Sequence, residues 1–196
     1  VRRLGISPQR DVVVYDGGAG AAAARAWWCL RWVGIERVRV LDGGLPAWVA
    51  AGLPLEAGDV APEPDDAVVV RPGGMPTVTA DEIEAGATGA LLDARAGERF
   101  RGEVEPVDPV AGHIPGAVSC PTTALLGPDG RYRPAVELRG VLAAALEAPG
   151  AVAYCGSGVT AAQLVLAAHE IGVELALYPG SWSHWVRDPQ RPVAVG

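Results

Sequence analysis

The chain has 196 residues, of which 49% are hydrophobic and 20% charged, and its formal net charge at pH 7 is −7. This composition excludes a disordered chain, and the lack of any run of Lys and Arg argues against a nucleic-acid-binding surface. No stretch reaches the roughly 20 apolar residues of a membrane span, and three cysteines are too few for a disulfide framework. We therefore expect a cytoplasmic protein that binds neither nucleic acid nor membrane.

Short apolar runs alternate with helical stretches along the chain. The apolar runs are bounded by turn residues and predict buried parallel strands at Val12–Tyr15, Val38–Leu41, Leu91–Asp93, Ala117–Ser119, Ala151–Tyr154 and Leu175–Tyr178. The predicted helices are Ala21–Val33, a helix from the capping box at Thr79 toward Ala85, Pro134–Glu147 and Thr160–Ile171. This alternation predicts an α/β fold, a parallel sheet flanked by helices, with ligands at the carboxyl ends of the strands.

Two stretches of the chain are similar to each other, Val12–Trp48 and Ala151–Trp185. Each holds an apolar run, a glycine-containing loop, an Ala-rich stretch and a final segment that ends in Trp. When the two are compared, Asp16 occupies the position of Cys155. A complete α/β series precedes the second copy, whereas only about ten residues precede the first.

The repeat and a proline-rich stretch between its copies predict how the chain is divided. We expect residues 1–53 to be the C-terminal half of one domain, residues 54–76 to be an extended linker, and residues 77–196 to be one complete domain. The other half of the first domain would then lie upstream of Val1, starting roughly 60 residues before it.

Cys155 follows a predicted buried strand, and the loop Gly156-Ser157-Gly158-Val159-Thr160 leads from it into a helix. Two glycines allow successive backbone N–H groups to point inward as an anion-binding nest, and the helix N-terminus adds positive potential. Cysteines in such settings are often thiolates, so Cys155 is the predicted nucleophile. Cys29 and Cys120 have no such loop and are expected to be buried and inert.

The loop suits either a phosphate or a persulfide, since both are anions that backbone amides can hold. A cysteine phosphatase needs an arginine at the end of this loop to bind phosphate through two hydrogen bonds. Ala161 stands at that place, which disfavours phosphoryl transfer and favours sulfur transfer. No spacing of Cys and His indicates a metal site, no nucleotide-binding motif is present, and no cofactor is expected.

The loop Cys155–Thr160 resembles the active-site loop of the rhodanese-type sulfurtransferases, in particular of the 3-mercaptopyruvate branch; the thiosulfate branch typically carries Arg-Lys at positions 156 and 157. Further matches to this family are Leu41–Gly44, Asp93–Arg95, Arg99–Gly102, Gly112–Ala117 and Tyr178–Trp182. The resemblance implies a rhodanese-like α/β fold in tandem domains. The first would be catalytically silent, because Asp16 cannot carry a sulfane sulfur.

The resemblance also implies a mechanism in two half-reactions. The Cys155 thiolate takes the sulfur of 3-mercaptopyruvate or the outer sulfur of thiosulfate and becomes a persulfide, which passes the sulfur to cyanide or a thiol, thioredoxin included. Backbone amides of Gly156, Ser157, Gly158, Val159 and Thr160 would stabilise the anion, and the Ser157 hydroxyl would help to activate the donor. Arg99 would bind the donor's carboxylate or sulfonate, the alternative being a surface ion pair with Glu98 or Glu103.

Other polar residues near these motifs receive structural interpretations. The family's second substrate arginine has no counterpart between Val104 and Ala111, and Arg101 is a candidate to replace it. His113 is expected to be structural and hydrogen-bonded near the start of a strand, and Asp93 and Arg95 are expected to form a buried pair that shapes the sheet end. His184 and Trp182 are expected to line the pocket mouth, and His169 to be exposed. A competing hypothesis is a non-catalytic remnant that binds anions or a partner.

Overall fold

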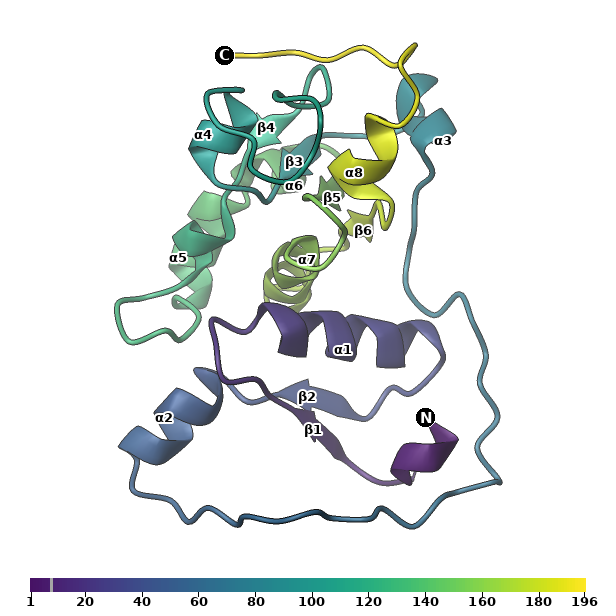
Figure 1. Cartoon of the computed structure of the whole chain (residues 1–196), viewed down its shortest axis with the longest axis vertical. Helices are drawn as coiled ribbons and strands as arrows, with labels where there is room; N and C mark the ends of the chain where they lie inside the picture. The colour runs from purple at the N-terminus through teal and green to yellow at the C-terminus, as the bar shows by residue number, and fades with distance from the viewer. Residues whose placement is uncertain (8) are drawn as a thin grey trace. The chain divides into compact units, whose positions relative to one another are not determined.

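The computed structural model describes residues 1–7 and 9–196 (Figure 1). The chain divides into two compact units, Val1–Met75 and Pro76–Gly196. Each unit contains a parallel sheet with helices packed against it, which confirms the predicted α/β class.

The first unit is built on two parallel strands, β1 (Val12–Val14) and β2 (Val38–Val40). Helix α1 (Ala21–Trp32) connects them and packs on both strands (Figure 1), and α2 (Gly44–Ala50) follows β2. A short 3-10 helix, η1 (Arg2–Leu4), precedes β1, and residues 53–75 contain no helix or strand.

The prediction that β1 is buried is wrong. Val13 is 56% exposed, and its neighbours Val12 and Val14 are only half-buried. Side chains alternate between the two faces of a strand, and α1 packs on this small sheet from one side (Figure 1). An apolar run therefore indicates a strand here without indicating burial on both faces.

The second unit contains a four-stranded parallel sheet in the order β4-β3-β5-β6. Its strands are β3 (Leu91–Asp93), β4 (Val118–Ser119), β5 (Val152–Tyr154) and β6 (Ala176–Leu177). The central strands β3 and β5 are wholly buried, as predicted, but β4 is an exposed edge strand. The register pairs Asp93 with Tyr154, so the chain leaves both central strands at the same edge of the sheet.

The helices of the second unit are short, apart from the one that follows the Cys155 loop. They are α3 (Ala80–Glu84), α4 (Gly97–Phe100), the 3-10 helix η2 (Thr122–Leu125), α5 (Ala135–Val141), α6 (Ala143–Glu147), α7 (Ala161–Glu170) and α8 (Ser181–Trp185). The capping box of Thr79 and Glu82 is present. The predicted helix Pro134–Glu147 is divided at Leu142, just after Gly140, a residue that weakens a helix interior. Helices α4 and α8 are too short to show a period in the sequence.

The loop after β1 is closed around the carboxylate of Asp16. One oxygen, Oδ1, accepts hydrogen bonds from the backbone N–H groups of Gly18 (2.9 Å) and Gly20 (3.1 Å), and Oδ2 accepts one from Ala23 (3.0 Å). Burial raises the pKa of Asp16, but these backbone hydrogen bonds outweigh it and lower the pKa overall. The residue at the position equivalent to Cys155 is thus a carboxylate held by amides.

We predict that Asp16→Ala lowers the free energy of unfolding by about 2 kcal/mol at pH 7, since it leaves three amides without their charged acceptor. A lowered pKa stabilises the fold above the pKa of the unfolded chain, near 4, and this stabilisation is lost as the pH falls. Urea unfolding between pH 7 and pH 3 should therefore show the variant and the parent chain converging. The exposed Asp59→Ala is the control, and an equal loss there would contradict the prediction.

Candidate active site

Cys155 lies directly after β5, and its side chain is only 1% exposed. The backbone N–H of Gly158 donates a hydrogen bond to its Sγ over 3.1 Å, so the loop folds back onto the sulfur. The N–H of Cys155 itself donates to Oγ of Ser181 over 3.1 Å. The sulfur is therefore a hydrogen-bond acceptor inside a closed loop, as the glycine spacing predicts.

The start of α8 is hydrogen-bonded to this loop. The N–H of Trp182 donates to the carbonyl of Cys155, and the N–H of Ser183 donates to the carbonyl of Gly156, each over 2.9 Å. The first unit repeats this arrangement, because the N–H of Leu45 donates to the carbonyl of Asp16 over 2.9 Å. The two copies of the sequence repeat therefore close their loops in the same way.

Ser181 was missed by the sequence reasoning. It is fully buried, and it has a positive φ of 54°, the only one among the described residues other than glycine. Its Oγ donates to the carbonyl of Tyr178 over 2.9 Å while accepting from Cys155. A signal did exist: the equivalent residue of the first copy is Gly44, with a φ of 57°, and a glycine there indicates a left-handed backbone.

Gly158 is required by both its conformation and its surroundings. Its φ is +79°, and a Cβ added to it would lie 2.5 Å from the carbonyl oxygen of Pro179. Any side chain would therefore push the loop away from the segment that leads into α8. Ser157 and Val159 on either side are exposed, so the rim of the loop faces solvent while the sulfur lies below it.

Helix α7 begins at Ala161, directly after the loop that follows Cys155. Between Cys155 and the first turn of this helix the chain carries no charged side chain. The positive potential offered to an anion by these residues therefore comes from backbone dipoles.

Arg99 lies beside this loop. A Cβ on Gly156 would be 3.7 Å from Nη1 of Arg99 and 3.8 Å from Nη2. Its side chain is 20% exposed, with Nε and Nη2 bound to the carboxylate of Glu105 over 3.2 and 2.6 Å. Oδ2 of Asp108 lies 3.6 Å from Nη2. The alternative of a surface ion pair with Glu98 or Glu103 is wrong, because the ionic partners are Glu105 and Asp108.

Arg101 does not join Arg99. It is half-exposed and forms two hydrogen bonds with the carboxylate of Glu103, over 2.8 and 2.9 Å. Nothing in this arrangement supports Arg101 as a second arginine of the site.

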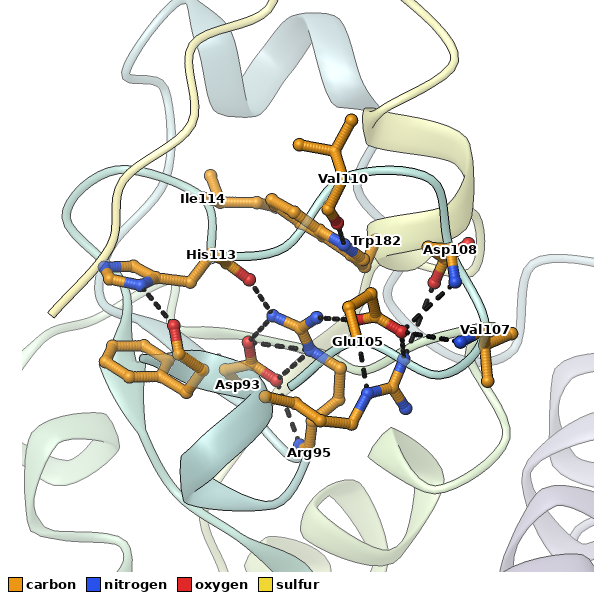
Figure 2. Close-up of polar contacts among 12 residues, drawn as sticks. Asp93, Arg95, Glu105, Val107, Asp108, Val110, His113, Ile114 and Trp182 are labelled. Carbon is orange, nitrogen blue, oxygen red and sulfur yellow. Dashed lines mark hydrogen bonds and ion pairs between the residues drawn. The ribbon is translucent and has the colours of Figure 1, made fainter. Parts of the chain in front are cut away.

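The pair Asp93 and Arg95 is buried and structural, as predicted (Figure 2). The Arg95 guanidinium binds the Asp93 carboxylate over 2.6 Å and the carbonyl of Gly112 over 2.6 Å, and reaches Glu105 over 3.2 Å. It also lies over the ring of Trp182, 4.7 Å from its centroid. Burial lowers the pKa of Arg95, but the hydrogen bonds and the charge of Asp93 outweigh burial and raise the pKa overall. The guanidinium therefore stays charged.

Trp182 and His184 differ in burial, although both are expected at the mouth of a pocket. Trp182 is fully buried, and its indole N–H donates to the carbonyl of Val110 over 2.9 Å (Figure 2), so the prediction that it lines a pocket mouth is wrong. His184 is exposed, and its Nδ1 lies 2.6 Å from the hydroxyl of Tyr178. His113 has the predicted structural role, because it is buried, stacked on Phe100 and hydrogen-bonded through Nδ1 to the Phe100 carbonyl over 2.8 Å.

The other cysteines lie outside the loop. Cys120 is buried, and burial raises the pKa of its thiol to about 11, as expected for an inert side chain. Cys29 is exposed on α1, so the expectation that it is buried is wrong. His169 is exposed, as predicted.

Across residues 1–7 and 9–196, no three His, Cys, Asp or Glu side chains are grouped to hold a metal ion, and no helix is long and apolar enough to span a membrane.

The fold and the cysteine loop together define a class of protein. The rhodanese-like domain family matches residues 2–51 and 75–188, and the chain belongs to this family.

Particular relatives extend this result. SseB of Mycobacterium tuberculosis, whose name includes the words thiosulfate sulfurtransferase, is 48% identical over 202 residues, covering 100% of this chain and 71% of SseB. A Pseudomonas aeruginosa protein, whose name includes the words 3-mercaptopyruvate sulfurtransferase, is 50% identical over 200 residues, covering 98% and 70%. The crystal structure of YnjE superposes with a TM-score of 0.88 at 28% identity, covering 100% of this chain and 51% of YnjE. The chain thus spans about half the length of that solved structure.

We predict that Gly158→Ala lowers the free energy of unfolding by about 2 kcal/mol or more, because the new methyl group meets the carbonyl of Pro179. Gly130→Ala is a matched control, since Gly130 has a φ of +75° and nothing within 4 Å of an added Cβ. Urea unfolding of both variants separates the shared backbone strain from the clash. Equal destabilisation of the two variants would contradict the close contact.

Proposed function

We propose that this chain is a sulfurtransferase that moves a sulfane sulfur from 3-mercaptopyruvate or thiosulfate through a persulfide on Cys155. The observation that carries the proposal is the hydrogen bond from the Gly158 amide to Sγ, inside a loop that is free of charged side chains. The names of the two relatives at 48% and 50% identity support a donor of either kind.

In the first half-reaction, the Cys155 thiolate attacks the outer sulfur of thiosulfate or the thiol sulfur of 3-mercaptopyruvate and forms an S–S bond. With thiosulfate, the original S–S bond breaks and its electron pair leaves with sulfite. With 3-mercaptopyruvate, the C–S bond breaks and its electron pair leaves as an enolate, which takes up a proton to become pyruvate. The amides of the loop from Gly156 to Thr160 stabilise the anion before and after this step.

In the second half-reaction, an acceptor attacks the outer sulfur of the persulfide. Cyanide becomes thiocyanate, and a thiol becomes a persulfide, while the electron pair of the S–S bond returns to Cys155 as a thiolate. Small thiols and thioredoxin are the acceptors that we propose, in the cytoplasm. No cofactor is needed, because each step exchanges one bond to sulfur for another.

Arg99 and Ser157 are the side chains that we propose for donor binding. The guanidinium of Arg99 lies next to Gly156, where it can pair with a carboxylate or a sulfonate. Ser157 is exposed on the rim, where its hydroxyl can donate to the donor's sulfur or accept from it.

We also propose which segments of the chain carry the reaction and which do not. Residues 77–196 carry the reaction, residues 54–76 are the linker, and residues 1–53 are part of a catalytically silent domain. The carboxylate of Asp16 occupies the amide nest of that domain, which supports its silence.

A second candidate is a non-catalytic module that binds an anion or a partner, favoured by the near-complete burial of Cys155. The two functions differ in turnover. We predict that the chain produces thiocyanate from cyanide with at least one of the two donors, and that Cys155→Ser reduces kcat at least a thousandfold. Cys120→Ser is the control and should retain activity. No turnover with either donor, or turnover that survives Cys155→Ser, would reject the sulfurtransferase.

A further inference from the structure

Arg99, the arginine proposed above for donor binding, is surrounded by more negative charge than its guanidinium neutralises. Glu105 is 4% exposed and accepts hydrogen bonds from both Arg95 and Arg99 as well as from the amides of Val107 and Asp108. Burial raises the pKa of Glu105, but these bonds lower it overall, so it is ionised. Figure 2 shows this carboxylate beside the guanidinium of Arg95, and its other oxygen lies 2.6 Å from Nη2 of Arg99.

Asp108 adds a second carboxylate on the same arginine. Its side chain is 8% exposed, and Oδ2 lies 3.6 Å from Nη2 of Arg99. Among the residues that the structure describes, this buried oxygen has no hydrogen-bond partner. Hydrogen bonds usually spread the charge of a buried carboxylate. The charge of Oδ2 therefore acts mainly through space on Arg99 and on any anion that Arg99 binds.

The ion-pair cluster around Arg95 and Arg99 carries a net negative charge. Two arginines, Arg95 and Arg99, are connected to three carboxylates, Asp93, Glu105 and Asp108, which leaves a net charge of −1 beside the loop. The loop from Cys155 to Thr160 adds no charged side chain to compensate. An incoming dianion is repelled by this excess about twice as strongly as a monoanion, because the Coulomb energy is proportional to the ligand's charge.

We propose that Asp108 is a specificity-determining residue that selects monoanionic donors over dianionic ones. This inference rests on the proposed function. At neutral pH, 3-mercaptopyruvate presents one carboxylate, whereas thiosulfate carries two negative charges. The charge of Asp108 opposes the binding of both anions, and it opposes the binding of the dianion about twice as strongly. Glu105 keeps the Arg99 guanidinium in place, and Asp108 sets the net charge that an incoming donor meets there.

Binding to the Cys155→Ser chain tests this selection without requiring sulfur transfer. Calorimetry at constant ionic strength gives Kd for thiosulfate, the dianion, and for pyruvate, a monoanion with the carboxylate of the donor. When Asp108→Asn is added to the Cys155→Ser chain, we expect both anions to bind more tightly. The affinity for thiosulfate should increase about tenfold more than the affinity for pyruvate. Asp108→Glu keeps the charge and should keep the original ratio of the two Kd values.

Two further variants provide controls. Asp129→Asn removes the same charge from an exposed position and should leave both Kd values unchanged. Arg99→Ala should abolish the binding of both anions. An unchanged ratio in Asp108→Asn, equal weakening of both anions, or no anion binding to the Cys155→Ser chain would overturn the proposal. Absent turnover by the parent chain would reject the sulfurtransferase instead, so the two failures are distinguishable.

Discussion

The hydrogen bond from the Gly158 amide to Sγ of Cys155 is the interaction on which the site depends. A sulfur anion that is almost completely buried is costly unless polar groups surround it. The Gly158 amide is one such group from the backbone, and its contact with Sγ requires a loop that turns back on itself directly after β5. Gly158 permits that turn because it has a positive φ and lies against the carbonyl of Pro179. The position of the sulfur thus follows from a backbone constraint.

The loop in turn depends on α8. Ser181 accepts from the Cys155 amide and donates to the Tyr178 carbonyl, so a single buried hydroxyl joins the ends of β5 and β6. Its positive φ is strained for a residue with a side chain, and these two hydrogen bonds offset the strain. The first unit reaches the same geometry with Gly44 and without the hydroxyl. The repeat therefore preserves backbone shape, while the chemistry of the residue that it holds differs between Asp16 and Cys155.

Sequence reasoning succeeded where the signal is local. The strands are predicted by short apolar runs and the capping box by Thr79 and Glu82, and the loop at Cys155 is evident from its glycines. It failed where contacts join distant residues. Burial of β1 and β4 depends on what covers them, and the partners of Arg99 lie on a loop whose path no periodicity reveals. The prediction for Trp182 is wrong because its ring packs against Arg95, a residue far away in the sequence.

The central claim is that the Cys155 loop holds a persulfide, and mass spectrometry of the intact protein after a single exposure to donor tests it most directly. The account predicts a gain of one sulfur atom that maps to the peptide containing Cys155, that cyanide removes, and that does not form in Cys155→Ser. A gain that persists in Cys155→Ser, or no gain from either 3-mercaptopyruvate or thiosulfate, would contradict it.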